Sequence, residues 1–210
     1  MSTSATRGGA SVSNTVPKPS MVVPDAQVTP EAPLPAGAVV IYSNLGTGST
    51  IYNAGTGWTE AGLEANDYPL AEAMSFIPSA DYVLVRIDAA FTYVTGTNGA
   101  KLVLAADNNG IPGNIIYHNT FSNLPDFGTC CVLQTAKLTP TKSNHITLHA
   151  GQRYWLYPLP ADTTSYLVWN YDTTNTGGSG AVSKDYGKTW TPATYDTFGA
   201  FDVYGIATSR

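Results

Sequence analysis

Hydrophobic and polar residues alternate along much of the chain from Val39 onward. A period of two is typical of β-strands that bury one face. The longest example runs from Asp81 to Val94, with apolar and aromatic residues on one face and Arg86, Asp88 and Thr92 on the other. The same pattern predicts further strands at Val39–Ser43, Lys101–Ala105, Asn114–Ser122, Cys130–Leu138, Gln152–Pro158, Tyr166–Tyr171 and Phe201–Ile206.

The segments between these strands carry turn residues. Asn98-Gly99, Asn109-Gly110 and Gly177-Gly178 are dipeptides that adopt positive φ at little cost, so they favour hairpins. Weak helical character is confined to Ala61–Met74, which Pro69 interrupts. Many short strands without alternating helices predict an all-β antiparallel sandwich, jelly-roll-like, over residues 39–210.

Residues 1–38 differ from the rest of the chain. They hold six of the 14 prolines and no aromatic residue, so they bury too little apolar surface to fold alone. Two interpretations stay open: a disordered leader, or an extended arm that becomes ordered along a partner. In the second, the candidate apolar anchors for docking are Val22, Val23, Val39, Val40 and Ile41.

Charge and hydropathy exclude some partners. Charged residues make up 12% of the chain and the net charge is −5, without the basic clusters that neutralise phosphates. No apolar run approaches the roughly 18 to 20 residues that span a bilayer, and no secretory signal is visible. We therefore expect neither nucleic-acid binding nor membrane insertion.

Residues 183–190 fit the pattern S-x-D-x-G-x-T-W, known as the Asp box, and resemble the hairpin motif of sialidases. Its physics is local, because Asp185 can accept backbone N–H bonds and Gly187 permits positive φ. One copy and four arginines do not suggest sialidase chemistry, so we expect a structural turn. A second turn is expected at Asp107 and Gly110, whose spacing does not match a calcium loop.

Catalytic and metal motifs are weak. His145 and His149 lie in a stretch read as strand, which would hold their rings roughly 13 Å apart, too far to share a zinc ion. No nucleophile elbow is present, and Glu60, Glu64 and Glu72 crowd into one irregular segment. We predict no enzymatic activity, no cofactor and no metal site.

Cys130 and Cys131 are the only cysteines, and they are adjacent. On a strand their side chains would point to opposite faces, which favours two reduced, mostly buried thiols. A vicinal disulfide is the alternative.

Aromatic residues offer another site. Most are expected in the core, but exposed aromatics could stack on sugar rings, and the candidates for glycan contact are Trp58, Tyr186 and Trp190. A glycoside hydrolase would need two converging carboxylates in a cleft.

Several phrases occur together in order: Ile41–Leu45, Phe76–Pro78, Asp107–Gly113, Phe127–Cys131, Tyr154–Leu156 and Gly199–Val203. As a set they resemble the choice-of-anchor domain of bacterial surface proteins sorted by PEP-CTERM-type tails, over about residues 39 to 208. The resemblance implies a non-catalytic extracellular β-sandwich and carries over no catalytic residue.

The sequence departs from that family because neither a secretory signal nor an apolar anchoring tail is visible. We therefore expect a structural or attachment protein on a virion or cell surface, such as a phage decoration, fibre or tail component. Its arm would dock it into a homo-oligomer or larger protein assembly. The alternatives are a glycan-binding module and, third, a glycoside hydrolase.

Overall fold

The computed structural model describes residues 33–208, and within that part the chain is an all-β antiparallel sandwich, which confirms the predicted fold class. A single 3-10 turn, η1 (Gly48–Thr50), is the one helical element among the described residues. No helix there is long and apolar enough to cross a membrane.

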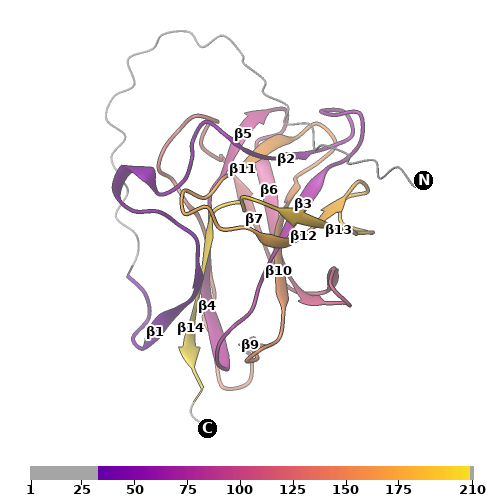
Figure 1. Ribbon diagram of the computed structural model, residues 1–210. Coiled ribbons are helices and arrows are strands. Elements are labelled where there is room, and N and C mark those ends of the chain that lie inside the picture. Colours follow the sequence, from indigo (N-terminus) through magenta and orange to yellow (C-terminus); the bar gives the residue numbers. More distant parts are fainter. Residues whose placement is uncertain (1–32, 209–210) are drawn as a thin grey trace, which may run out of the picture.

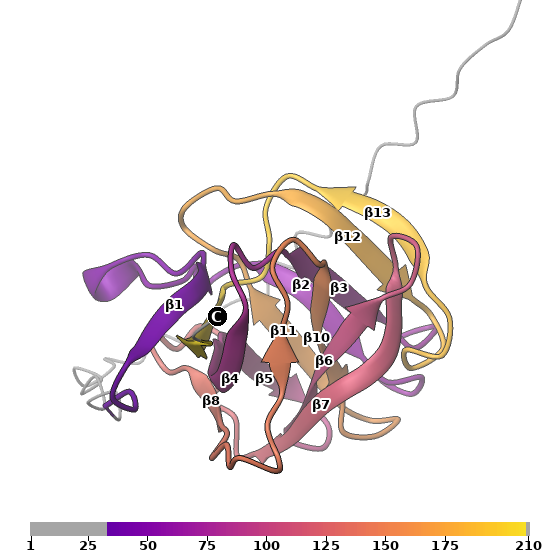
Figure 2. The ribbon, with the colours of Figure 1, turned by 90° about the horizontal axis from the view of Figure 1, so that it is seen from below.

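One layer is a six-stranded sheet that curves along one side of the molecule (Figures 1 and 2). Its strands, in spatial order, are β13 (Thr191–Tyr195), β12 (Gly178–Ser183), β3 (Ala71–Phe76), β10 (Tyr154–Pro160), β6 (Gly99–Asp107) and β7 (Pro112–Ser122).

The other layer combines two smaller sheets. The first contains β1 (Ala38–Ser43), β14 (Phe201–Ala207), β4 (Tyr82–Ala89) and β8 (Gln134–Lys137), with β9 (Thr147–Leu148) also paired to β4. The second contains β2 (Gly57–Ala61), β11 (Tyr166–Asn170) and β5 (Phe91–Thr95).

The main core lies between the two layers, where inward-facing residues of both meet. Trp169 and Phe201 are fully buried there, and the Trp169 indole N–H donates to the carbonyl of Ala200 at 3.2 Å. Burying each large apolar side chain contributes roughly 1.5 to 3 kcal/mol, so these residues dominate the stability of the sandwich.

The predicted strand Asp81–Val94 is two strands. β4 ends at Ala89 and β5 begins at Phe91, and the two belong to different sheets. Between them the N–H of Ala90 donates to the carbonyl of Ala200 at 3.0 Å. The alternation is real, but the chain leaves one sheet and enters the next at Ala90.

Two other predictions of local structure are wrong. The weakly helical stretch Ala61–Met74 contains the end of β2 and the first part of β3, because β3 pairs with β10 and β12 on its two sides. In Cys130–Leu138 only β8 is strand, and the two cysteines lie in the loop before it.

The outward face of the six-stranded sheet is also packed. Trp155 and Tyr157 alternate with core residues of β10, yet they are 0% and 2% exposed. The Trp155 indole N–H donates to Asp107 at 2.8 Å, and Tyr157 meets the Trp190 ring edge-on. These aromatics therefore form a second, smaller core beneath the loops.

An ion pair is buried on the outward face of β4. Arg86 Nε lies 2.7 Å from Asp88 Oδ2, and the two side chains are 3% and 0% exposed. Thr135 of β8 also donates its hydroxyl proton to Asp88, at 2.6 Å. The Arg86 guanidinium lies 5.4 Å from the ring centre of Tyr204 on β14. The ion pair lies within β4, and its contacts with Thr135 and Tyr204 reach the two neighbouring strands, β8 and β14.

Candidate functional site

The predicted docking residues lie on β1, the edge strand of its sheet. β1 pairs with β14, and no other described strand pairs with its second edge. Val39 and Val40 are 45% and 52% exposed, while Ile41 is half-buried against the main core. Val22 and Val23 lie outside the described residues.

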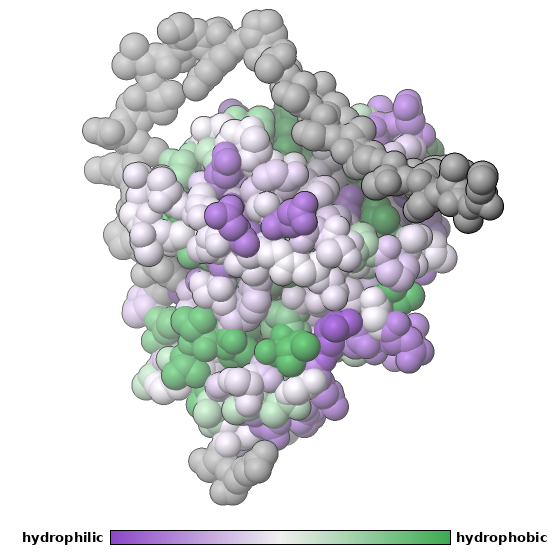
Figure 3. Space-filling view, in the orientation of Figure 1, coloured by the Kyte–Doolittle hydropathy of each residue, from purple (hydrophilic) through white to green (hydrophobic). Residues whose placement is uncertain are grey.

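Apolar side chains gather over β1 and its neighbours β14 and β4, as Figure 3 shows in the orientation of Figure 1. An edge strand presents unpaired N–H and C=O groups that can pair with another extended chain. The strand begins at Ala38, so the segment expected to be an arm leads directly into this edge. The edge of β1 can therefore offer an extended partner both backbone hydrogen bonds and apolar contacts.

The Asp-box hairpin is closed by its own side chains. Asp185 Oδ1 accepts the N–H groups of Lys188 and Thr189 at 3.0 and 2.8 Å. Ser183 donates to the same oxygen at 2.8 Å and accepts the N–H of Gly187. Gly187 has a φ of 76°. The carboxylate is occupied by the turn and holds it in place.

The Asp107 turn is closed in a similar way. Asp107 Oδ2 accepts the N–H of Gly110 at 3.1 Å, while its Oδ1 accepts the indole proton of Trp155. Gly110 has a φ of 90°. The side chain therefore joins the turn to the outer aromatic cluster.

The three candidate glycan contacts each have internal partners. Trp58 is half-buried between Tyr171 and Tyr195, and its indole N–H donates to the carbonyl of Thr197 at 3.0 Å. The structure does not bring Trp58, Tyr186 and Trp190 into one described pocket. Trp190 packs on Tyr157 with ring centres 4.7 Å apart.

Tyr186 accepts the N–H of Leu63 at 2.8 Å and has a φ of 62°. Its hydroxyl thus links the Asp-box hairpin to the segment after β2.

Two of the glutamates do come together, but inside the protein. Glu60 of β2 is 0% exposed, and its carboxylate accepts the backbone N–H of Glu72 at 3.1 Å. Glu72 of β3 is 6% exposed and accepts the hydroxyl proton of Tyr195 on β13. Glu64, the third glutamate of the segment, is exposed and accepts the Thr163 hydroxyl proton.

Burial governs the protonation of this pair. Removal from water raises the pKa of Glu72 to about 7, although the Tyr195 hydroxyl and the charge of Lys184 act against it. Burial, and then repulsion from Glu72, hold the pKa of Glu60 well above its usual range. Burial and the neighbouring carboxylates also raise the pKa of Tyr195. Both carboxyls therefore hold their protons more tightly than exposed glutamates do, and both are buried.

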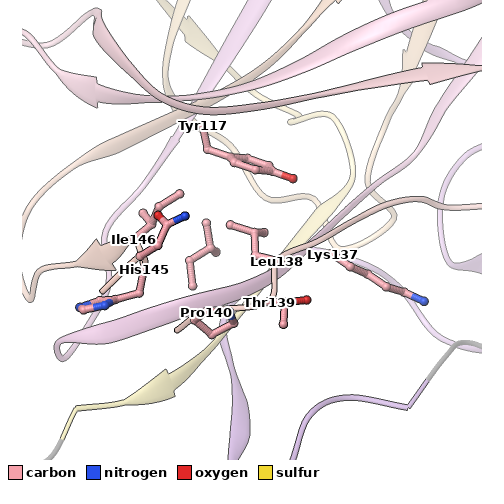
Figure 4. A pocket seen from close by; sticks show the side chains of 9 residues that line it. Tyr117, Lys137, Leu138, Thr139, Pro140, His145 and Ile146 are labelled. Atoms are coloured by element: carbon pink, nitrogen blue, oxygen red, sulfur yellow. The ribbon is translucent and has the colours of Figure 1, made fainter. Parts of the chain in front are cut away.

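A cleft of about 230 Å³ opens between β7 and the segment that follows β8 (Figure 4). Apolar side chains of Leu84, Leu138 and Ile146 line it, and Tyr117 extends from the β7 side. Lys137 and His145 lie at opposite ends and point apart in Figure 4. The cleft therefore presents a mixed apolar and polar lining, in which Lys137 and His145 do not converge on one point.

The two histidines have separate surroundings. His145 Nδ1 lies 3.2 Å from the carbonyl of Thr141, and His149 Nδ1 lies 3.7 Å from Asp81. Within residues 33–208 no three His, Cys, Asp or Glu side chains come together in a way that could hold a metal ion.

Cys130 and Cys131 are joined by a disulfide across a cis peptide bond, so the expectation of two reduced thiols is wrong. The physical reason is that these residues lie in a loop with a bend at Cys131, where adjacent side chains can meet, and not in a strand. Both side chains are half-buried.

Sequence reasoning missed the cleft, the contact between Glu60 and Glu72, and the clustering of Tyr195 with them. One feature of the sequence could have indicated the contact between Glu60 and Glu72. The two glutamates are twelve positions apart, and each lies at an inward-facing position of its strand. Comparison of the chain with protein families, with characterised proteins and with solved structures found no significant match.

Proposed function

We propose that this chain is a non-enzymatic structural or attachment protein of a virion or cell surface. Its N-terminal arm, residues 1–38, docks onto a neighbouring subunit or larger assembly, and the β-sandwich is displayed. The observation that carries the proposal is the open edge of β1, with Val39 and Val40 exposed where the arm enters the fold.

Strand addition at the β1 edge supplies the binding energy. An extended segment that lies along an open sheet edge gains main-chain hydrogen bonds, and alternate side chains gain apolar contact. A segment rich in Pro, Ser and Thr loses less entropy on binding in extended form than on folding into a core. By contrast, the edge strand β13 carries Pro192, which lacks the N–H that pairing requires.

The alternatives have less support. Glycan binding by Trp58 or Trp190 would require rings that now pack against other aromatics to become available. Glycoside hydrolysis would require a substrate to reach the paired acids, and Glu60 is fully buried. The resemblance to choice-of-anchor domains agrees with a β-sandwich and supplies no site residue.

The test compares the full chain with two variants of edge residues. Val40→Lys places a charge on the β1 edge region, and the matched control Val94→Lys changes a valine of similar exposure, 41%, on β5. Deletion of residues 1–32 removes most of the arm and leaves β1 intact. Oligomeric mass is measured by light scattering, and cross-linking locates the contact.

We expect the full chain and the Val94→Lys variant to form the same oligomer, or to be incorporated into a larger assembly to the same extent. The deletion and Val40→Lys should lower assembly by about tenfold or more, the equivalent of one lost apolar contact. Equal assembly of all four proteins would overturn the docking role of the arm and of β1.

A further inference from the structure

The Cys130–Cys131 disulfide lies at the contact between two surface loops. The cysteines belong to the loop 123–133 between β7 and β8, and the facing loop 44–56 connects β1 to β2. The Sγ atoms of Cys130 and Cys131 lie 3.5 and 3.6 Å from the carbonyl oxygen of Ser49, which belongs to η1. Segments about eighty positions apart therefore meet at the two sulfurs.

Tyr52 hydrogen-bonds to the backbone on both sides of the cysteine pair. Its hydroxyl donates to the carbonyl of Thr129 at 2.8 Å and accepts the N–H of Val132 at 2.9 Å. These two peptide groups flank the cysteine pair on either side. Tyr52 is 2% exposed, and burial raises the pKa of its phenol, so the O–H stays available as a donor.

Apolar packing completes the contact. Tyr52 forms a small cluster with Ala90 and Ala200, and partly buried side chains surround it. Those side chains are Leu45, Ile51, Ala54, Cys130, Cys131 and Leu133. The sulfurs thus help to close this cluster on its half-exposed side.

The bond has little to contribute to global stability. Disulfides stabilise mainly by closing long loops in the unfolded chain, and this one joins adjacent residues. Its effect is therefore local, on the turn and on whatever the turn contacts. Partly exposed disulfides are also the ones that reductants reach.

We propose that Cys130 and Cys131 form a reversible redox site whose substrate is a small or protein dithiol, and whose state sets how firmly loop 123–133 holds loop 44–56. A thiolate of the dithiol attacks one sulfur and forms a mixed disulfide, releasing the other cysteine as a thiol. The second thiol of the dithiol then displaces the first cysteine. Two electrons and two protons pass to the protein, and the dithiol leaves as its own disulfide.

The experiment uses the full chain with and without dithiothreitol under native conditions, followed by alkylation, intact mass and hydrogen exchange. Reduction should add two hydrogens and label both cysteines. Amides of 129–132 and 46–52 should then exchange about tenfold faster or more, while β10 and β3 keep their protection. In the double variant Cys130→Ser/Cys131→Ser, the same amides should exchange as fast as in the reduced wild type, and dithiothreitol should not change their rate.

Tyr52→Phe separates the disulfide from the hydrogen bonds. It keeps the ring and the two cysteines but removes both bonds of the hydroxyl, so the Val132 amide should exchange faster even before reduction. Two results would overturn the proposal. The first is a disulfide that dithiothreitol reduces only in the presence of denaturant. The second is a reduction that leaves hydrogen exchange in both loops unchanged, or that also accelerates exchange in the core strands.

Discussion

The hydroxyl of Tyr195 on β13 donates to the carboxylate of Glu72 on β3, although 123 positions separate the two residues. β12 lies between their strands in the sheet. The Tyr195 ring reaches β3 because it crosses Gly180 of β12, where a Cβ atom would clash with it. A titratable carboxyl and the edge strand of the six-stranded sheet are therefore directly connected.

The first prediction concerns pH. The pKa of Glu72 is about 7 in the folded protein and near 4.5 without burial, so the folded state holds the proton more tightly. The contribution of Glu72 to the free energy of unfolding should be complete below about pH 4.5 and should be lost as the pH rises from there through about 7. The full difference is at most about 3 kcal/mol for Glu72. Urea unfolding at pH 5, 6, 7 and 8 measures it.

Glu72→Gln should reduce the slope of this profile, because an uncharged amide has no proton to lose. The slope that remains comes from Glu60 and Asp202, whose pKa values burial also raises. The control is Glu64→Gln, which changes an exposed glutamate of the same segment and should leave the slope intact. Asp162 does not confuse the window, since hydrogen bonds from Thr97 and Thr164 lower its pKa to about 2. A flat wild-type profile between pH 5 and 8 would contradict the prediction.

The second prediction concerns the ion pair of β4. Asp88→Ala removes the buried partner of Arg86 and an acceptor of the Thr135 hydroxyl proton. Breaking a buried pair from one side costs about 3 to 5 kcal/mol, because the buried Arg86 loses its ion pair with Asp88 and the Asp88 site loses its charge. Thermal and urea unfolding measure the loss. Asp126→Ala, at an exposed aspartate, should cost less than about 1 kcal/mol, and equal losses would refute the assignment.

The third prediction concerns the Asp-box hairpin. Asp185→Ala removes the acceptor of two backbone N–H groups and of the Ser183 and Thr189 hydroxyl protons. Stability should fall by about 1 to 3 kcal/mol, and hydrogen exchange should accelerate in residues 184–190. Lys188→Ala, on the same turn, should behave like the wild type in both measurements. Unchanged exchange in the aspartate variant would mean that the turn is held by other contacts.

The sequence predicts strands best where apolar residues recur at every second position, as Phe201 and Val203 do in β14. It fails at β3, whose residues Ala71, Glu72, Ala73 and Met74 favour helix and become strand only because β10 and β12 flank them. It fails differently at Ala90, where one alternation continues across a change of sheet.

The candidate sites also differ in how far they could be predicted from local sequence. The Asp-box pattern can be read locally, because Asp185 bonds to residues within four positions of itself. The Glu60, Glu72 and Tyr195 cluster depends on which strands become neighbours. The spacing of the two glutamates is a local signal, but nothing local connects Tyr195 to Glu72 across 123 positions. Predicting the disulfide would have required knowing that Cys130 and Cys131 lie in a bent loop and not in a strand.

The antiparallel pairing of β1 with β14 has a mechanical consequence. Ala38 lies opposite Ile206, so a tether entering before β1 and a cargo fused after β14 would pull on the same end of the pair. Such a force breaks the interstrand bonds one after another, as a zipper opens, and not all together in shear. Force applied between a tether before β1 and a cargo after β14 should therefore separate β1 from its sheet first.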